Sequence, residues 1–306
     1  MEPVLIALAR LVAGPSEDAH RGRECASTRR WSWPTPSARS SAGAMEPEIR
    51  RLHGGADRAV GPATVLGAGF PRVEPWWAIV ANGLAGTMLE LDEGNRFARG
   101  HPGIHVLPAA LAEAERLGRS GAALLAALVV GYDVAARLGG GAPVRPGMHM
   151  HGVHGAVGAA AAVARLRELD AEVTARALGV AAGLTLGTSW RTALGGATVR
   201  NAYAGVAGAN GWLAVDLAVA GYHAASPTCS TRSSAGSAAP GWMRPRSWTA
   251  SGERFEISRN YFKRHACCRY NHPAVEAIEE ILAATPVAPG GDRVDPRRGR
   301  RPSAPR

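Results

Sequence analysis

The sequence predicts a mainly α-helical protein, in which a bundle of alanine- and glycine-rich helices is followed by the start of a smaller α+β domain. Two observations support this prediction. Apolar residues recur at helical spacing through most of the chain. Alanine and glycine dominate these stretches, whereas sheet proteins favour β-branched and aromatic residues. At 306 residues the chain is long enough to bury a sizeable core.

Helices are predicted from apolar residues at helical spacing and from residues that cap helix ends. Ser120 and Asp170 are suited to begin two of them, because their side-chain oxygens can accept backbone N–H groups of the first turn. Pro108 is placed in the first turn of another, where proline is tolerated. The predicted helices are Pro3–Ala13, Trp76–Leu91, Pro108–Leu117, Gly121–Leu138, Val153–Leu169, Asp170–Leu186, Ala202–Ala220 and Pro273–Ala284.

Extended structure is predicted at two places. The segment ATVLGAGF, which begins at Ala63, is expected to form a short extended piece where order resumes after the first helix. Its Gly67 and Gly69 resemble the start of a dinucleotide-binding loop. Arg72, however, stands where the last glycine belongs, so we reject that interpretation. Later, RFEISRNYFKR alternates like a strand and is expected to open the α+β domain.

This pattern divides the chain into three parts. Residues 1–252 are expected to form the helical domain, residues 253–288 the start of a small, truncated α+β domain, and residues 289–306 a basic tail. Within the helical domain, residues 15–44 and 223–250 break the pattern. Like the tail, they are rich in Ser, Arg, Pro and Ala and have no helical or strand period. We expect these segments to be poorly ordered, either as native linkers or as products of a shifted reading frame.

Composition and charge argue against several functions. The net charge of +10 gathers in the three irregular segments, so we predict no nucleic-acid binding. The longest apolar runs stop short of the roughly 18 residues needed to span a bilayer, and the N-terminus lacks a basic region. Neither a membrane span nor a signal peptide is therefore predicted. Four cysteines do not make a disulfide framework in so long a chain, which predicts a reduced, cytoplasmic setting.

Candidate catalytic residues gather where acidic and imidazole groups stand close in sequence. Glu90, Asp92 and Glu93 precede His101 in a loop rich in glycine and asparagine. Imidazole titrates near neutrality, and a nearby carboxylate can set its tautomer and raise its pKa, which suits acid–base catalysis. Taken alone, the acids could also be a solvated helix end, and His101 or His149 could be structural.

Lys263 is the only lysine in the chain. All the other basic residues among the 35 lysines and arginines are arginine. A single lysine among so many arginines indicates that a compact, easily tuned ammonium group is needed there, with chance placement as the alternative. The nearby Cys267 and Cys268 are interpreted as packing residues, since neighbouring cysteines form a disulfide only with strain.

The histidines also allow a metal site. His149, His151 and His154 form an H-x-H-x-x-H cluster, and His101 and His105 are four residues apart. The proline and glycine between the latter two argue against a regular helix there, and no zinc-type spacing is met. The leading prediction is a protein without a metal, and a metal-dependent enzyme built on the cluster is the alternative.

Five segments occur in an informative order. In the first, LELDEGNRFARGHPG, an acidic motif of the D-F-D-D type precedes H-P-G. It is followed by GYDVAARLG, GMHMHGVHGAVGAAAAVARL, VRNAYAGVAGANG and FKRHACCRYNHPAVEAI. This order resembles the MmgE/PrpD family of lyases and isomerases, over roughly Ala63–Tyr222 and Glu253–Leu282.

The resemblance implies a cofactor-free enzyme that acts on a small di- or tricarboxylic acid. Dehydration of a 2-methylcitrate-like acid is the leading reaction, of the hydro-lyase type, and decarboxylation and epimerisation are the others. By position the resemblance assigns catalytic roles to His101, His149, Glu90, Asp92 and Lys263.

The resemblance also bears on substrate binding and assembly. Arg200 stands where the family usually has a second lysine, and we expect it to bind substrate together with Lys263 by holding a carboxylate. A homodimer is implied as well. We predict that His101, His149 and Lys263 converge on one site, with His151 outside it. An inactive, truncated remnant is a further alternative.

Overall fold

The computed structural model describes residues 2–14, 40–54, 59–67, 69–141, 144–224 and 254–285. The chain divides into two compact units, Met1–Ala266 and Cys267–Arg306. The described residues are mostly helical, so the prediction of a mainly α protein is confirmed. The irregular residues 15–39, 225–250 and 289–306 lie outside the described residues.

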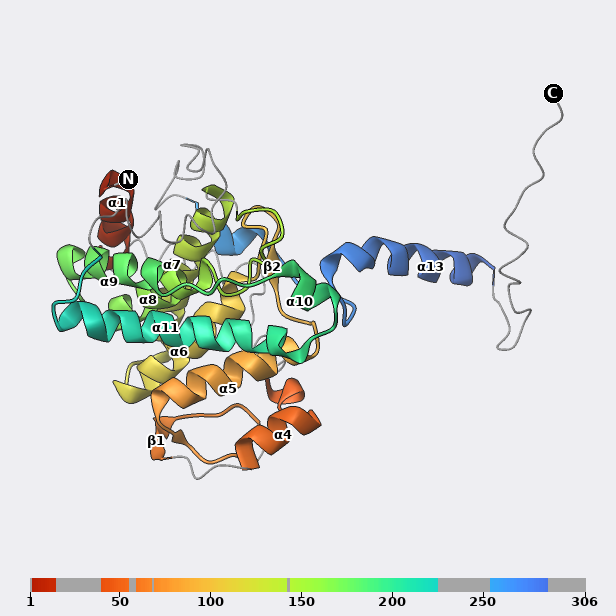
Figure 1. Ribbon diagram of the computed structural model, residues 1–306, viewed down its shortest axis with the longest axis horizontal. Helices are drawn as coiled ribbons and strands as arrows, with labels where there is room; N and C mark the ends of the chain where they lie inside the picture. Colours follow the sequence, from red (N-terminus) through yellow and green to blue (C-terminus); the bar gives the residue numbers. More distant parts are fainter. Residues whose placement is uncertain are drawn as a thin grey trace. The chain divides into compact units, whose positions relative to one another are not determined.

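The first unit is built from nine labelled helices and three very short strands among its described residues (Figure 1). The helices are α1 Glu2–Ala13, α4 Pro47–Gly54, α5 Pro75–Met88, α6 Pro102–Arg116, α7 Gly121–Gly141, α8 Gly155–Leu166, α9 Ala171–Gly183, α10 Trp190–Leu194 and α11 Ala202–Val219. The strands are β1 Val60–Ala63, β2 Gly94–Asn95 and β3 Asn260–Tyr261, and the 3-10 turns are η1 Thr198–Asn201 and η4 Glu256–Arg259. In the second unit, η5 Arg269–Asn271 leads into α13 His272–Ala284.

Helix α8 forms the centre of the first unit. It packs against α6, α7, α9 and α11, and all of its residues except Arg165 are buried (Figure 1). The close packing depends on small residues. A Cβ atom added to Gly158 would lie 2.6 Å from the backbone oxygen of Gly131 on α7. Real Cβ atoms do not approach backbone so closely, so the alanine- and glycine-rich sequence is what lets these helices touch.

Both predicted N-caps are confirmed. The Ser120 side chain accepts the Ala123 N–H at 3.2 Å, and the Asp170 side chain accepts the Val173 N–H at 2.8 Å. Among the described residues α7 alone is long and apolar enough to cross a membrane, but 72% of its most apolar window is buried inside the structure. Its composition is therefore accounted for by its place in the helical core.

The expected start of α6 was wrong. The helix begins at Pro102, so Pro108 lies inside it and a regular helix does connect His101 to His105. Proline costs little at the first helical position, because the N–H that it lacks would have no partner inside the helix. The next free N–H, from Gly103, donates to the Glu93 side chain at 2.8 Å, a cap from outside the helix.

Order also resumes earlier than expected. Residues 40–43 are helical, and both Ser40 and Ala44 are buried. The Ser40 hydroxyl donates to the Asn82 carbonyl oxygen on α5 at 3.3 Å. The prediction that ordered structure resumes at Ala63 was therefore wrong. Residues 40–44 pack on α5, and local composition does not reveal that contact.

Residues 254–266 pack with the helical unit. Within the predicted strand, Glu256–Arg259 form the turn η4, and only Asn260 and Tyr261 pair with β2. Phe255 and Ile257 are buried in a cluster with residues of α6 and α7. The buried Asp133 carboxylate on α7 accepts the Glu256 N–H at 2.8 Å. The first unit thus extends to Ala266, whereas the sequence placed a boundary after residue 252.

Candidate active site

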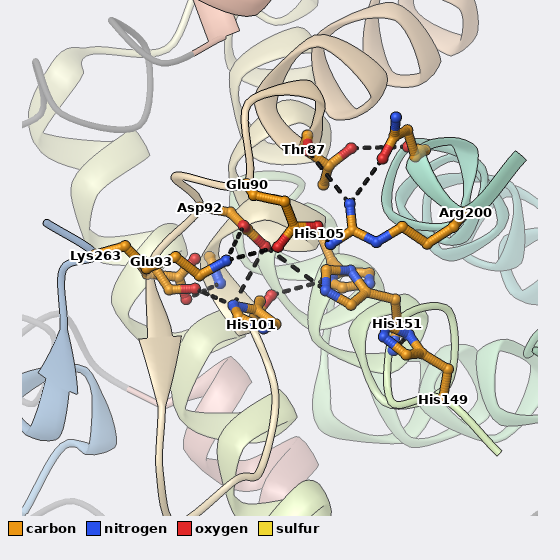
Figure 2. Close-up of polar contacts among 12 residues, drawn as sticks. Thr87, Glu90, Asp92, Glu93, His101, His105, His149, His151, Arg200 and Lys263 are labelled. Atoms are coloured by element: carbon orange, nitrogen blue, oxygen red, sulfur yellow. Dashed lines mark hydrogen bonds and ion pairs between the residues drawn. The ribbon is translucent and has the colours of Figure 1, made fainter. Parts of the chain in front are cut away.

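Polar side chains from five segments of the first unit meet in one cluster (Figure 2). They come from the loop after α5, the start of α6, the loop before α8, the turn η1 and the residues after β3. In that order the segments contribute Glu90, Asp92 and Glu93; His101 and His105; His149 and His151; Arg200; and Lys263.

Asp92 lies at the centre of this cluster and is 2% exposed. One carboxylate oxygen accepts the Lys263 ammonium at 2.8 Å, and the other lies 3.2 Å from Nδ1 of His101. Burial by itself would raise the pKa of Asp92, but His101 and Lys263 outweigh burial and lower that pKa. Asp92 is therefore ionised at neutral pH and can orient an imidazole and stabilise its cation.

The backbone fixes the orientation of His101. Its Nδ1 lies 2.5 Å from the carbonyl oxygen of Glu93, and because a carbonyl can only accept, this nitrogen carries the proton. The neutral ring then has its lone pair on Nε2. The Asp92 carboxylate and the Glu93 carbonyl thus both contact Nδ1, and Nε2 is left to act as a base. This arrangement suits proton abstraction.

Three imidazole rings form a stack. His151 lies between His101, with ring centroids 4.7 Å apart, and His149, at 4.8 Å. Burial lowers the pKa of His149 to about 4 and that of His151 well below its ordinary value, so both rings are neutral at neutral pH. Nδ1 of His149 accepts a hydrogen bond from the backbone N–H of His151 at 3.2 Å, which places the His149 proton on Nε2. The stack therefore offers an N–H donor on His149, one ring beyond the proton acceptor on His101.

The loop that carries these two histidines is anchored from both sides. The Thr188 hydroxyl lies 2.8 Å from the carbonyl oxygens of both His149 and His151. His105 on α6 donates from Nδ1 to the His101 carbonyl at 2.8 Å and accepts the Gly152 N–H on Nε2 at 3.1 Å. Nε2 of His105 thus holds the loop while Nδ1 fixes the ring against the start of α6, and burial lowers the pKa of His105 to about 4.

The two cationic residues are joined through Glu90. One Glu90 oxygen accepts the Lys263 ammonium at 3.0 Å, and the other forms an ion pair with Arg200. Arg200 also donates to the Asn201 side chain at 2.7 Å and to the Thr87 carbonyl at 3.3 Å. These contacts hold the guanidinium in place at the junction of α5 and α11.

Comparison with known proteins identifies the family of this chain. The sequence model of the MmgE/PrpD N-terminal domain matches residues 40–239. The chain belongs to the MmgE/PrpD family. The matched region contains every residue of the cluster except Lys263, which lies beyond it in the same compact unit.

Two curated proteins match more of the chain than this family domain does. Both are cis-aconitate decarboxylases of Aspergillus terreus, one of them from strain NIH 2624 / FGSC A1156. Each is 29% identical over 244 residues, which is 74% of this chain and 49% of the relative. The chain therefore spans about half the length of the curated relatives it matches.

All six residues that the sequence assigned to the site contact this cluster. Asp92, Glu90, Arg200, Lys263 and His101 are linked by ion pairs, and His149 joins them through the ring of His151. Their contributions to catalysis stay predictions.

Sequence reasoning missed three members of the site. His151 was expected outside it but lies between the two candidate acid–base histidines. The role of His105 in holding the loop was not foreseen. Trp190 packs edge-on against His149, with ring centroids 4.5 Å apart. The H-x-H spacing could have indicated His151, since the loop is short, but no local signal marks Trp190.

The histidine cluster weighed as a metal site is not assembled as one. Among the described residues of the first unit, the side chains with ligand atoms within 4.8 Å of one another are Asp92, His101 and His151. Nδ1 of His101 already donates its proton to the Glu93 carbonyl, and Lys263 binds Asp92. In this arrangement Asp92 and His101 are engaged in an ion-pair network, and the prediction of a protein without a metal stays a prediction.

Proposed function

We propose that this chain is a lyase or isomerase that acts on a small di- or tricarboxylic acid by histidine acid–base catalysis. One observation supports this more than any other. The buried carboxylate of Asp92 binds both His101 and Lys263, so a base and a cation are held side by side. A reaction that removes a proton next to a carboxylate needs this combination.

The leading reaction is dehydration of a 2-methylcitrate-like acid. Nε2 of His101 takes the proton from the carbon next to a carboxylate, and Asp92 stabilises the imidazolium that forms. Lys263 and Arg200 bind carboxylates and stabilise the negative charge that develops on the substrate. The imidazolium of His101 then gives its proton to the leaving hydroxyl group, which His149 holds by a hydrogen bond from Nε2–H, so that the C–H and C–O bonds break and water departs.

Decarboxylation is the second candidate, because the two matched relatives are named cis-aconitate decarboxylases. In that reaction the bond between a carbon and its carboxylate breaks, carbon dioxide leaves, and a histidine supplies a proton to the carbon. The same cations and the same proton donor serve either reaction. A homodimer that needs no cofactor, as the family resemblance implies, and a cytoplasmic setting, as the cysteine content predicts, are part of this proposal.

Turnover in deuterated water tests the proposal. The purified chain is incubated separately with 2-methylcitrate, citrate and cis-aconitate, and each reaction is followed by proton NMR. We expect one acid to be consumed or to exchange a carbon-bound proton for deuterium. Lys263→Ala should lower kcat/KM by at least about a hundredfold, because losing a positioned acid, base or charge typically costs this much.

Arg176→Ala is the matched control, since Arg176 is a cation on α9 paired with the exposed Glu172. This change should leave kcat/KM unaltered. If no acid is consumed and none exchanges its protons, the lyase proposal is wrong and the inactive remnant takes its place. Equal losses of kcat/KM from the two substitutions would show that Lys263 has no role in catalysis.

A further inference from the structure

The carboxylate of Glu90 lies between the two cations that the proposed function assigns to substrate. One oxygen binds the Lys263 ammonium at 3.0 Å, and the other binds the Arg200 guanidinium (Figure 2). A substrate carboxylate that bridged these cations would make the same two contacts. Glu90 and such a substrate group therefore compete for one position.

Charge balance makes this competition strict. Arg200 and Lys263 carry two positive charges, which Glu90 and Asp92 already match. A polycarboxylate that entered without displacing either acid would add negative charge to a largely buried site. Burying an uncompensated charge is costly, so one of the two acids must give up its place.

Burial and contacts identify Glu90 as the acid that moves. The Asp92 side chain is fully buried and bound to both His101 and Lys263, whereas the Glu90 side chain is 29% exposed. Glu90 also has a φ of +52°, in the left-handed region that non-glycine residues seldom adopt. Its long side chain has access to solvent that the Asp92 side chain lacks.

We propose that Glu90 is an internal stand-in for a substrate carboxylate. In the empty site it holds Arg200 and Lys263 in their binding positions, and an incoming carboxylate displaces it toward solvent. Glu90 thereby lowers the affinity for every anion but rejects most strongly those ligands that cannot replace its two contacts. This inference rests on the proposed function, because that function assigns the two cations to substrate.

Binding of tricarballylate, the unreactive propane-1,2,3-tricarboxylate, tests this role by isothermal titration calorimetry. It has no hydroxyl group to expel, so binding is measured apart from turnover. Glu90→Gln removes the competing charge at almost constant shape. Because a hydrogen bond to a charged group contributes about 1.5–3 kcal/mol, tenfold or more in affinity, we expect the Kd to fall at least about tenfold.

Glu168→Gln provides a closely matched control. Glu168 also has a positive φ, of +57°, and also pairs with an arginine, Arg119, at 3.1 Å, but it lies outside the cluster. This variant should bind tricarballylate as the wild type does. Glu90→Gly is the second test variant, because it removes the carboxylate and also relieves the backbone strain, and it should show the same gain as Glu90→Gln.

The outcomes separate this inference from the proposed function. If both Glu90 variants bind tricarballylate as weakly as the wild type or more weakly, the stand-in role is wrong, even if the wild type turns over a polycarboxylate. Failure of all variants to bind also overturns it. If the Glu90 variants bind more tightly and no polycarboxylate is turned over, the inference holds and the lyase proposal fails.

Discussion

Two clusters of buried charged groups lie in the same helical unit, and they differ in how fully they are satisfied. Around Glu113 on α6, the carboxylate accepts two hydrogen bonds from Arg116, one from Arg167 at 2.6 Å, and one from the Trp212 indole at 2.8 Å. Around Asp92, both ring nitrogens of His151 have no hydrogen-bond partner among the described residues, and the nearer one lies 3.6 Å from an Asp92 oxygen.

This difference separates a structural cluster from a site. The Glu113 cluster ties α6, α8 and α11 together and leaves its carboxylate no capacity for another ligand. The Asp92 cluster keeps donors and acceptors unmatched, and such groups persist in a fold when a ligand or a reaction uses them. The following substitutions test whether one cluster serves stability and the other chemistry.

Glu113→Gln should have the largest effect on stability. We expect the free energy of unfolding at pH 7 to fall by about 3–5 kcal/mol, because Arg116 and Arg167 lose a buried counter-charge. Urea denaturation measures this change, and tricarballylate binding by the folded protein should stay the same. Glu172→Gln, which breaks the exposed pair with Arg176, should cost less than about 1 kcal/mol. A loss of ligand binding with unchanged stability would contradict the comparison.

The effect of Glu93→Gln on stability should depend on pH in the opposite sense to that of Glu113→Gln. Burial raises the pKa of Glu93 from 4.5 to about 7. A carboxyl group whose pKa is raised in the folded state binds its proton more tightly there, so wild-type stability falls as pH rises from about 4.5 to about 7. Glutamine has no such loss. The variant should therefore gain up to about 3 kcal/mol relative to the wild type across this range.

Urea denaturation at pH 4.5, 6 and 8 measures that gain. For Glu113 the sign is reversed. Burial raises its pKa, but Arg116 and Arg167 outweigh burial and lower the pKa. The stabilisation from Glu113 is therefore present at neutral pH and is lost on acidification. If the two glutamine variants follow the same pH trend, the two carboxyl groups do not differ as proposed.

His151→Ala sharpens the comparison with a smaller effect. The sequence suggested that this change would cost little, but the ring lies between His101 and His149. We expect kcat for the acid that is turned over to fall at least about tenfold, since the rings of His101 and His149 lose the group that holds their spacing. His223→Ala, at an exposed histidine, is the control. Equal rates in both variants would return His151 to a structural role.

The sequence by itself determined most of the helices and the residue types of the site. Ser120 and Asp170 cap their helices as predicted, because a cap depends on residues three positions apart. The ordered motifs identified the family, and the only lysine of the chain lies in the cluster. These features follow from local spacing, and local spacing is visible in a sequence.

Only the tertiary structure decided which groups are partners. Lys263 contacts Asp92 and Glu90 across 171 and 173 positions of sequence, and it reaches them because β3 pairs with β2 and the buried Asp133 binds the Glu256 backbone. The early start of α6, the place of His151 and the position of Glu90 between two cations also depend on such distant contacts. The spacing of residues along one helix or loop cannot specify them, because each requires the packing of several segments at once.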